Sequence, residues 1–261
     1  MLETAEEFNT LIELSDENVL NDLDEHNRAL EDMPTSTEVV DRMFTDFGQD
    51  TRAVDSVLVE DGYVPHRLQE QVHKRMMEYR FTVLVCHRRW GKTVLAINAL
   101  CHAAVENNGY MGKPGRYAYI APLLGQAKQV SWLYLKAFAA RVKGCKKHEG
   151  ELYVEFPNGS RITLYGASEG NSERLRGLFL DGAVFDEPSD MPLHVWPEIV
   201  RPALADHNGW VLFIGTPRGI NMFSERYEHA LKEEDWLSFM FKSSETKLPW
   251  LPEEELVSIQ R

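Results

Sequence analysis

Apolar positions along the chain gather into short runs rich in β-branched and aromatic residues, and these runs alternate with amphipathic stretches. Each run has the length and texture of a buried strand. The predicted strands are Phe81–Cys86, Arg116–Ala121, Leu180–Phe185, Trp210–Gly215 and Trp236–Phe241. Strands that alternate with helices imply βαβ units, so the pattern predicts a largely parallel sheet with helices on both faces.

The stretches between these strands have helical spacing. The predicted helices are Pro65–Arg80, Thr93–Glu106, Gln126–Lys143 and Asn221–Lys232. One segment breaks the alternation, because residues 151–166 hold two strand-like runs on either side of Asn158 and Gly159. Both turn residues tolerate positive φ, and this segment is therefore predicted to form a β-hairpin.

The first 61 residues have a different character and contain no strand-like run. They hold 18 acidic and 3 basic side chains, a net charge of −15, whereas residues 62–261 carry +2. Short helices are expected around Ala5–Leu14 and Glu38–Phe47, and the segment is either a solvated arm or a folded docking appendage. Because the excess negative charge is confined here, the total of −13 does not exclude a nucleic-acid partner.

The overall composition indicates a soluble globular protein, with 43% hydrophobic and 26% charged residues. The sequence shows neither an apolar run long enough to span a membrane nor the pattern of a secretory signal. The three cysteines form no CxxC pair and suit neither zinc nor a disulfide framework, which favours a reducing, intracellular setting. Residues 248–261 are polar and punctuated by proline, as expected for the start of a linker.

The strongest chemical signal is CHRRWGKT at residues 86–93, between a predicted strand and a predicted helix. This is the context of a phosphate-binding loop. Gly91 lets the backbone approach phosphates, Lys92 can reach the β- and γ-phosphates, and the Thr93 hydroxyl can bind Mg²⁺. Cys86 replaces the first glycine of the usual pattern, so a chance GKT at a helix start is the alternative.

The other loop residues are also candidates for contact with a nucleotide. His87 and Trp90 are neighbours of the phosphate-binding residues in the chain. Arg88 and Arg89 place two guanidinium groups beside the predicted phosphate site. Guanidinium groups there either bind the γ-phosphate or pair with nearby carboxylates.

Two later strand ends carry further candidates. The run DGAVFDE ends in Asp186, which can hold Mg²⁺, and Glu187, which can orient and polarise the attacking water. The run FIGTP places Thr216 where a small polar side chain could sense the γ-phosphate. Taken alone, each is an ordinary strand-to-turn junction, and the functional interpretation depends on their order after the loop.

A fourth candidate precedes the loop. Gln69, in PHRLQ, could pair with the amino group and N7 of adenine. A glutamine without a ligand role is the alternative, since helices often contain this residue.

The ordered set of motifs from Tyr63 onward resembles the large terminase subunits of tailed bacteriophages. The motifs are PHRLQ, HRRWGKT, YIAPLLGQAKQVSW, FPNGSRITLYG, RLRG, DGAVFDE, VRPAL and LFIGTPRG. The resemblance implies an α/β P-loop NTPase fold of the additional-strand type, with a mostly parallel central sheet flanked by helices. It also implies ATP and Mg²⁺ as cofactors and the translocation of double-stranded DNA into a procapsid.

The same resemblance assigns roles to individual positions. These are γ-phosphate contact for Arg88, phosphate and Mg²⁺ binding for Lys92 and Thr93, Mg²⁺ binding for Asp186, catalysis for Glu187, coupling for Thr216 and adenine recognition for Gln69. An arginine from a neighbouring subunit is expected to complete the site. Arg141, at the end of the helix Gln126–Lys143, is the first candidate, with Arg174 and Arg176 as competitors and a solvated helix-end cation as the alternative.

The resemblance further implies a domain order and partners. Residues 62–247 are expected to form the ATPase domain, after an appendage at 1–61 and before a linker at 248–261. A nuclease domain would follow the linker, so we expect no nuclease activity from this chain. The expected partners are the portal protein, the procapsid and the small terminase subunit. The expected setting is the host cytoplasm, with a homo-oligomeric ring on the portal and a monomer in isolation.

Two other functions would share parts of these motifs. A helicase-like DNA translocase would continue into a second domain with its own arginine finger. A nucleotide-binding module that does not hydrolyse ATP would have no need for the carboxylate of Glu187, which argues against that class.

Overall fold

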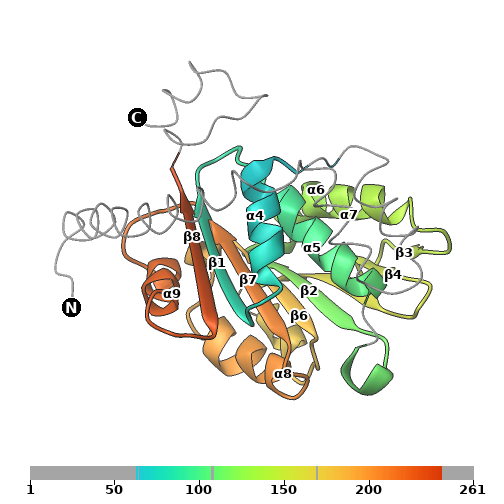
Figure 1. Cartoon of the computed structure of the whole chain (residues 1–261). Coiled ribbons are helices and arrows are strands. Elements are labelled where there is room, and N and C mark those ends of the chain that lie inside the picture. Colours follow the sequence, from blue (N-terminus) through green and yellow to red (C-terminus); the bar gives the residue numbers. More distant parts are fainter. Residues whose placement is uncertain (1–62, 64, 107–108, 169, 243–261) are drawn as a thin grey trace.

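One sheet of eight strands runs through the part of the chain that the computed structural model describes, which is residues 63, 65–106, 109–168 and 170–242 (Figure 1). The predicted helices before residue 62 and the predicted linker lie outside these residues. The strand order is β3-β4-β5-β2-β6-β7-β1-β8. The strands are β1 (Phe81–Cys86), β2 (Arg116–Ala121), β3 (Lys146–His148), β4 (Tyr153–Glu155), β5 (Arg161–Gly166), β6 (Gly182–Asp186), β7 (Trp210–Gly215) and β8 (Trp236–Phe241).

The sheet is mostly parallel, as predicted. The pairs β5–β2, β2–β6, β6–β7, β7–β1 and β1–β8 are parallel. Two pairs at one edge of the sheet, β3–β4 and β4–β5, are antiparallel, and β4–β5 is the predicted hairpin. The central order β1-β7-β6 inserts β7 between β1, which precedes the loop with Gly91, and β6, which ends in Asp186. This inserted strand confirms the predicted additional-strand type.

Helices cover both faces of the sheet, and each face has its own apolar core (Figure 1). One face carries α4 (Arg67–Met76), α5 (Lys92–Glu106), α6 (Leu124–Gln129) and α7 (Ser131–Ala139). The other face carries a π-helix (Val195–Val200), α8 (Arg201–Ala205) and α9 (Met222–Ala230). Across the described ranges, no helix combines the length and apolar character needed to cross a bilayer.

The structure corrects several predicted elements. The single helix Gln126–Lys143 is wrong, because the chain breaks at Val130 (φ −115°, ψ −66°) into α6 and α7. Arg141 consequently lies in the turn after α7 rather than at a helix end. Strand β6 begins two residues later than predicted, since the amide of Leu180 donates instead to the carbonyl of Ala203. The short strand β3, the π-helix and α8 were not predicted.

A polar contact fastens the start of the described chain to this fold. The hydroxyl of Tyr63 hydrogen-bonds Nε2 of His73 on α4 at 2.8 Å, and the Tyr63 ring meets Phe138 of α7 edge-on. Burial lowers the pKa of His73, and the nearby His102 lowers it further. Burial likewise lowers the pKa of His102. Both rings are therefore neutral in the folded protein at pH 7.

We expect the neutral ring of His73 to make the stability of the fold sensitive to acid. The unfolded chain binds a proton at His73 below about pH 6.5, whereas the folded chain resists protonation, so stability falls as pH drops below that value. The variant His73→Gln should reduce the loss of unfolding free energy between pH 7 and pH 5 by about 2 kcal/mol. Urea denaturation at pH 7 and at pH 5 measures the free energy of unfolding of both proteins.

The control is His148→Gln, on the edge strand β3, which should keep the wild-type acid dependence. Equal slopes for wild type and His73→Gln would contradict the assignment.

Candidate active site

The loop between β1 and α5 curls tightly because two of its residues have left-handed backbone. Arg89 has φ 65° and Gly91 has φ 94°. A Cβ on Gly91 would lie 2.6 Å from Nε2 of Gln69, so glycine is required both by the backbone and by the space. Helix α5 begins at the next residue, Lys92, and directs its free amides into the curl.

Helix α4 clamps this loop from one side. Gln69 is buried, with its Nε2 donating to the carbonyl of Gly91 at 3.2 Å and its Oε1 accepting from the amide of His66 at 3.1 Å. His66 Nε2 hydrogen-bonds the carbonyl of Trp90 at 3.1 Å. Gln69 thus braces the loop backbone. Its predicted recognition of adenine stays a prediction.

An aromatic anchor holds the loop from the other side. The Trp90 side chain is fully buried, stacks on Phe241 of β8 with 5.2 Å between ring centroids and meets His66 edge-on. His87 is also buried, and its Nδ1 hydrogen-bonds the carbonyl of Arg88 at 2.7 Å. Burial lowers the pKa of His87, so its ring is neutral. Trp90 and His87 therefore serve the loop through packing and through their backbone groups.

The remaining loop residues face outward. The side chains of Arg88 and Arg89 are exposed. Their guanidinium groups are accessible from solvent, and the predicted contact of Arg88 with the γ-phosphate stays a prediction.

Cys86, which replaces the usual first glycine, is buried in β1. Burial raises the pKa of its thiol to about 12, so it stays a neutral strand residue.

Lys92, Thr216 and Glu187 meet at the carboxyl ends of β1, β7 and β6. Lys92 Nζ donates to the Thr216 hydroxyl at 3.1 Å and lies 3.4 Å from the Glu187 carboxylate. Glu187 accepts two hydrogen bonds from Thr216, one from the amide (3.1 Å) and one from the hydroxyl (3.0 Å). The structure thereby brings together three residues that the sequence spreads over 125 positions.

Glu187 has an unusual backbone that the neighbouring strand supports. Its φ of 50° and ψ of 58° are left-handed, which costs a residue with a side chain on the order of 1 kcal/mol. The amide of Glu187 donates to the carbonyl of Ile214 on β7 at 2.9 Å, and the bonds from Thr216 fix its carboxylate. This strained turn aims the carboxylate toward Lys92 instead of letting it follow the strand.

Asp186 lies beside this group but bonds in a different direction. It accepts a hydrogen bond of 2.5 Å from the hydroxyl of Tyr119 on β2. Burial raises the pKa of Asp186 to about 6, while the bond from Tyr119 opposes that rise. Thr93 also hydrogen-bonds Tyr119, so the two predicted Mg²⁺ ligands share one buried partner. The sequence analysis did not single out Tyr119, because a tyrosine in an apolar run looks like a core residue.

The donor set fits the cofactors that the sequence implies. In the described part of the chain, no group of three or more His, Cys, Asp or Glu side chains could hold a metal ion. A hydroxyl and one carboxylate, from Thr93 and Asp186, instead match the sparse oxygen ligation of Mg²⁺, which takes its other ligands from water and substrate phosphates. The start of α5 at Lys92, with amides that have no partner within the helix, suits the phosphates themselves.

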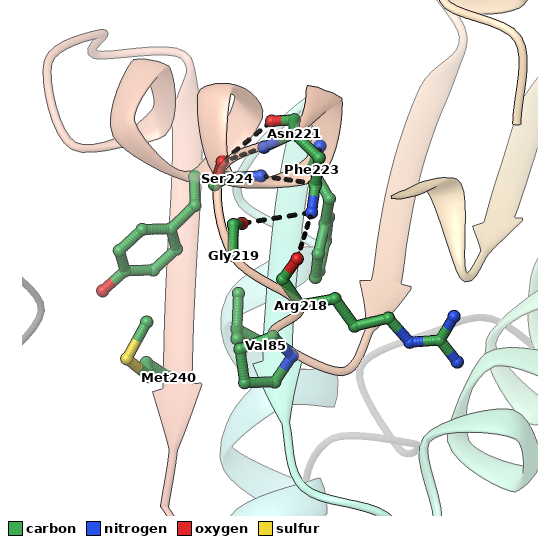
Figure 2. Close-up of a pocket in the computed structure, with 9 residues that line it drawn as sticks. Val85, Arg218, Gly219, Asn221, Phe223, Ser224 and Met240 are labelled. Atoms are coloured by element: carbon green, nitrogen blue, oxygen red, sulfur yellow. Dashed lines mark hydrogen bonds between the residues drawn. The ribbon is translucent and has the colours of Figure 1, made fainter. Parts of the chain in front are cut away.

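The turn after Thr216 is held rigidly by one side chain (Figure 2). Asn221 Nδ2 donates to the carbonyls of Arg218 and Gly219, while its Oδ1 accepts from the amides of Phe223 and Ser224. The cavity behind this turn measures about 10 Å³, which is enough for one water and far too small for a nucleotide. The side chain of Asn221 therefore joins the turn after Thr216 to the start of α9.

The candidates for a trans arginine separate by exposure. Arg141 is half-buried, and its Nε donates to the carbonyl of Ala137 in the preceding turn. The predicted role of Arg141 as a trans arginine stays a prediction. Arg174 and Arg176 are exposed, and Arg176 pairs with Glu173 at 2.7 Å. The exposed pair can reach a neighbouring molecule, whereas Arg141 would first have to leave its own turn.

Solved structures share this architecture. The large terminase ATPase domain of Thermus phage P74-26 is similar over 72% of this chain and 84% of that one, with 22% identity and a TM-score of 0.58. The HK97 bacteriophage large terminase covers 78% of this chain, with 13% identity and a TM-score of 0.60. Identities this low show the fold.

Sequence comparisons identify the family of the chain. The terminase large subunit of Thermus virus P23-45 is 29% identical over 182 residues, which are 63% of this chain but 36% of that relative. That of Escherichia phage T5 is 26% identical over 205 residues and 45% of its length. The chain thus spans less than half the length of these relatives. Residues 86–261 match the family model for the N-terminal part of the T4likevirus-type terminase large subunit, and the chain belongs to this family.

Proposed function

We propose that this chain is the ATPase motor domain of a terminase large subunit and couples hydrolysis of Mg-ATP to translocation of double-stranded DNA into a procapsid. The observation that carries the proposal is the contact among Lys92, Thr216 and Glu187 beside the loop at residues 86–91. These groups supply a phosphate-binding cation, a carboxylate base and a polar link between them. Family membership supports the proposal, as does a similar solved structure, the large terminase of bacteriophage D6E in complex with ADP.

Each residue then has a defined task. The amides at Gly91 and the start of α5 bind the phosphates, and Lys92 neutralises their charge. Thr93 and Asp186 would hold Mg²⁺, which supplies charge neutralisation and alignment of the phosphates when bound. Glu187 polarises the attacking water, because its carboxylate is already fixed by two bonds from Thr216.

Thr216 gives the site a way to report its state. Lys92 Nζ donates to the Thr216 hydroxyl and also lies against Glu187, so a phosphate that attracts Lys92 competes with both contacts. The same hydroxyl donates to Glu187, and the following turn is held by Asn221. A change at the phosphate therefore reaches the loop between β7 and α9 through a single side chain.

The assembly follows from the same proposal. Residues 62–247 are the motor, residues 1–61 dock a basic partner or shield the DNA face, and 248–261 lead toward a nuclease domain. The partners are DNA, the portal, the procapsid and the small terminase subunit, with a homo-oligomeric ring on the portal in the host cytoplasm.

The catalytic role of Glu187 can be tested by Glu187→Gln. The amide keeps the shape and can still accept from Thr216, but it cannot polarise water. We expect ATP turnover to fall by about 10²- to 10³-fold while ATP affinity stays within a few-fold of wild type. Steady-state phosphate release and fluorescent-nucleotide titration measure the two quantities.

The control is Glu234→Gln, an exposed glutamate in the loop before β8, which should leave both unchanged. Lys92→Ala should lose affinity as well as turnover. Wild-type turnover in Glu187→Gln would remove the carboxylate from the mechanism.

A second test concerns the trans arginine. We propose that the exposed Arg174 and Arg176 loop, rather than Arg141, completes the site of a neighbouring subunit. The wild-type ATPase should then rise in specific activity with protein concentration, since association supplies the missing cation. Arg174→Ala with Arg176→Ala should abolish that rise while ATP affinity stays intact.

Arg141→Ala is the matched control and should retain the rise with concentration. Loss of the rise in Arg141→Ala alone would return the assignment to Arg141 and contradict the argument from burial.

A further inference from the structure

We propose that Tyr119 is a positioning residue of the Mg²⁺ site and that its hydroxyl holds Thr93 and Asp186 in fixed relation to each other. The proposal rests on the proposed ATPase function and deepens it. Tyr119 belongs to neither the loop nor the strand end that carries the ligands. It reaches them from the middle of β2, the strand next to β6.

The register of the sheet explains why a tyrosine stands there. Tyr119 pairs with Val184, two residues before Asp186. Residues two apart on a strand share a face, so Tyr119 and Asp186 point to the same side. The span from mid-strand to the strand end suits a long side chain with a polar tip. The Tyr119 hydroxyl meets Asp186 Oδ2 at 2.5 Å.

The hydrogen bonds around this hydroxyl have a consistent direction. The phenol of Tyr119 has a single proton, and it donates this proton in the hydrogen bond to Asp186 Oδ2. Thr93 and Ser131 hydrogen-bond the same phenol oxygen, so their hydroxyls can only donate to it. The donors therefore run from Thr93 to Tyr119 and from Tyr119 to Asp186.

This direction is the one that a cation site requires. A hydroxyl that gives a lone pair to Mg²⁺ must place its proton on another acceptor, and Tyr119 supplies that acceptor to Thr93. Asp186 accepts the hydrogen bond from Tyr119 on Oδ2, which leaves Oδ1 for the cation or its water. One buried phenol thereby fixes the orientation of both ligands.

Removal of the hydroxyl should therefore weaken metal binding rather than nucleotide binding. Tyr119→Phe keeps the ring in the core but leaves Asp186 Oδ2 and the Thr93 proton without this partner. Loss of such a supporting bond commonly weakens metal affinity about 10- to 100-fold. We expect Mn²⁺ to bind at least about 10-fold more weakly in the presence of ADP, with ADP affinity in EDTA within about twofold of wild type.

The measurement is electron paramagnetic resonance of free Mn²⁺ during titration of the full chain with ADP, with thermal melts to verify folding. Tyr117→Phe is the matched control, because Tyr117 lies on the same strand, is equally buried and donates to the carbonyl of Ala103 on α5. It should bind Mn²⁺ as wild type does. Ser131→Ala, which removes another partner of the phenol, should shift Mn²⁺ affinity in the same direction but less.

Three outcomes decide the matter. Weaker Mn²⁺ binding in Tyr119→Phe and Ser131→Ala, with Tyr117→Phe unchanged, supports the proposal. If wild type binds Mn²⁺ with ADP and Asp186→Asn abolishes this, but neither Tyr119→Phe nor Ser131→Ala shifts it, then Tyr119 has no positioning role and the proposed function stands. If wild type binds no Mn²⁺ with ADP, the ATPase proposal and the role of Tyr119 fall together.

Discussion

The insertion of β7 between β1 and β6 is the constraint on which the site depends. Neighbouring parallel strands lie about 4.8 Å apart, so their carboxyl ends present side chains within hydrogen-bonding reach. With β7 in the centre, Thr216 stands between Lys92 and Glu187 and contacts both. If β1 and β6 were adjacent, Lys92 and Glu187 would form an ion pair without Thr216 between them. No neutral side chain would then respond when the position of Lys92 changes.

Much of the fold follows from local patterns in the sequence. Strands β1, β2, β7 and β8 begin and end where their apolar runs do. The first three are central strands buried on both faces, and β8 is an edge strand covered by aromatic contacts. The break at Val130 could not be predicted, since no proline or glycine marks it. It arises because Trp132 and Leu135 turn into the core while Val130 remains half-exposed. The polar edge strand β3 has no apolar signal to reveal it.

The same limit applies to the site. Residues at strand ends, such as Lys92 and Thr216, could be placed together because parallel strands end at a common edge. The side-chain contacts between different helices and strands could not be predicted from the sequence. The bond from Gln69 to the backbone of Gly91 has no signal in the sequence, and Tyr119 looked like a core residue but bonds to Asp186. Side-chain reach across a sheet depends on register, which only the assembled fold determines.

The stack of Trp90 on Phe241 has a mechanical meaning. The loop packs through Trp90 against Phe241, the final residue of β8, and the chain continues from there to Lys242. Under the proposed function, a displacement of the loop would be transmitted to the end of β8 across this one pair of rings.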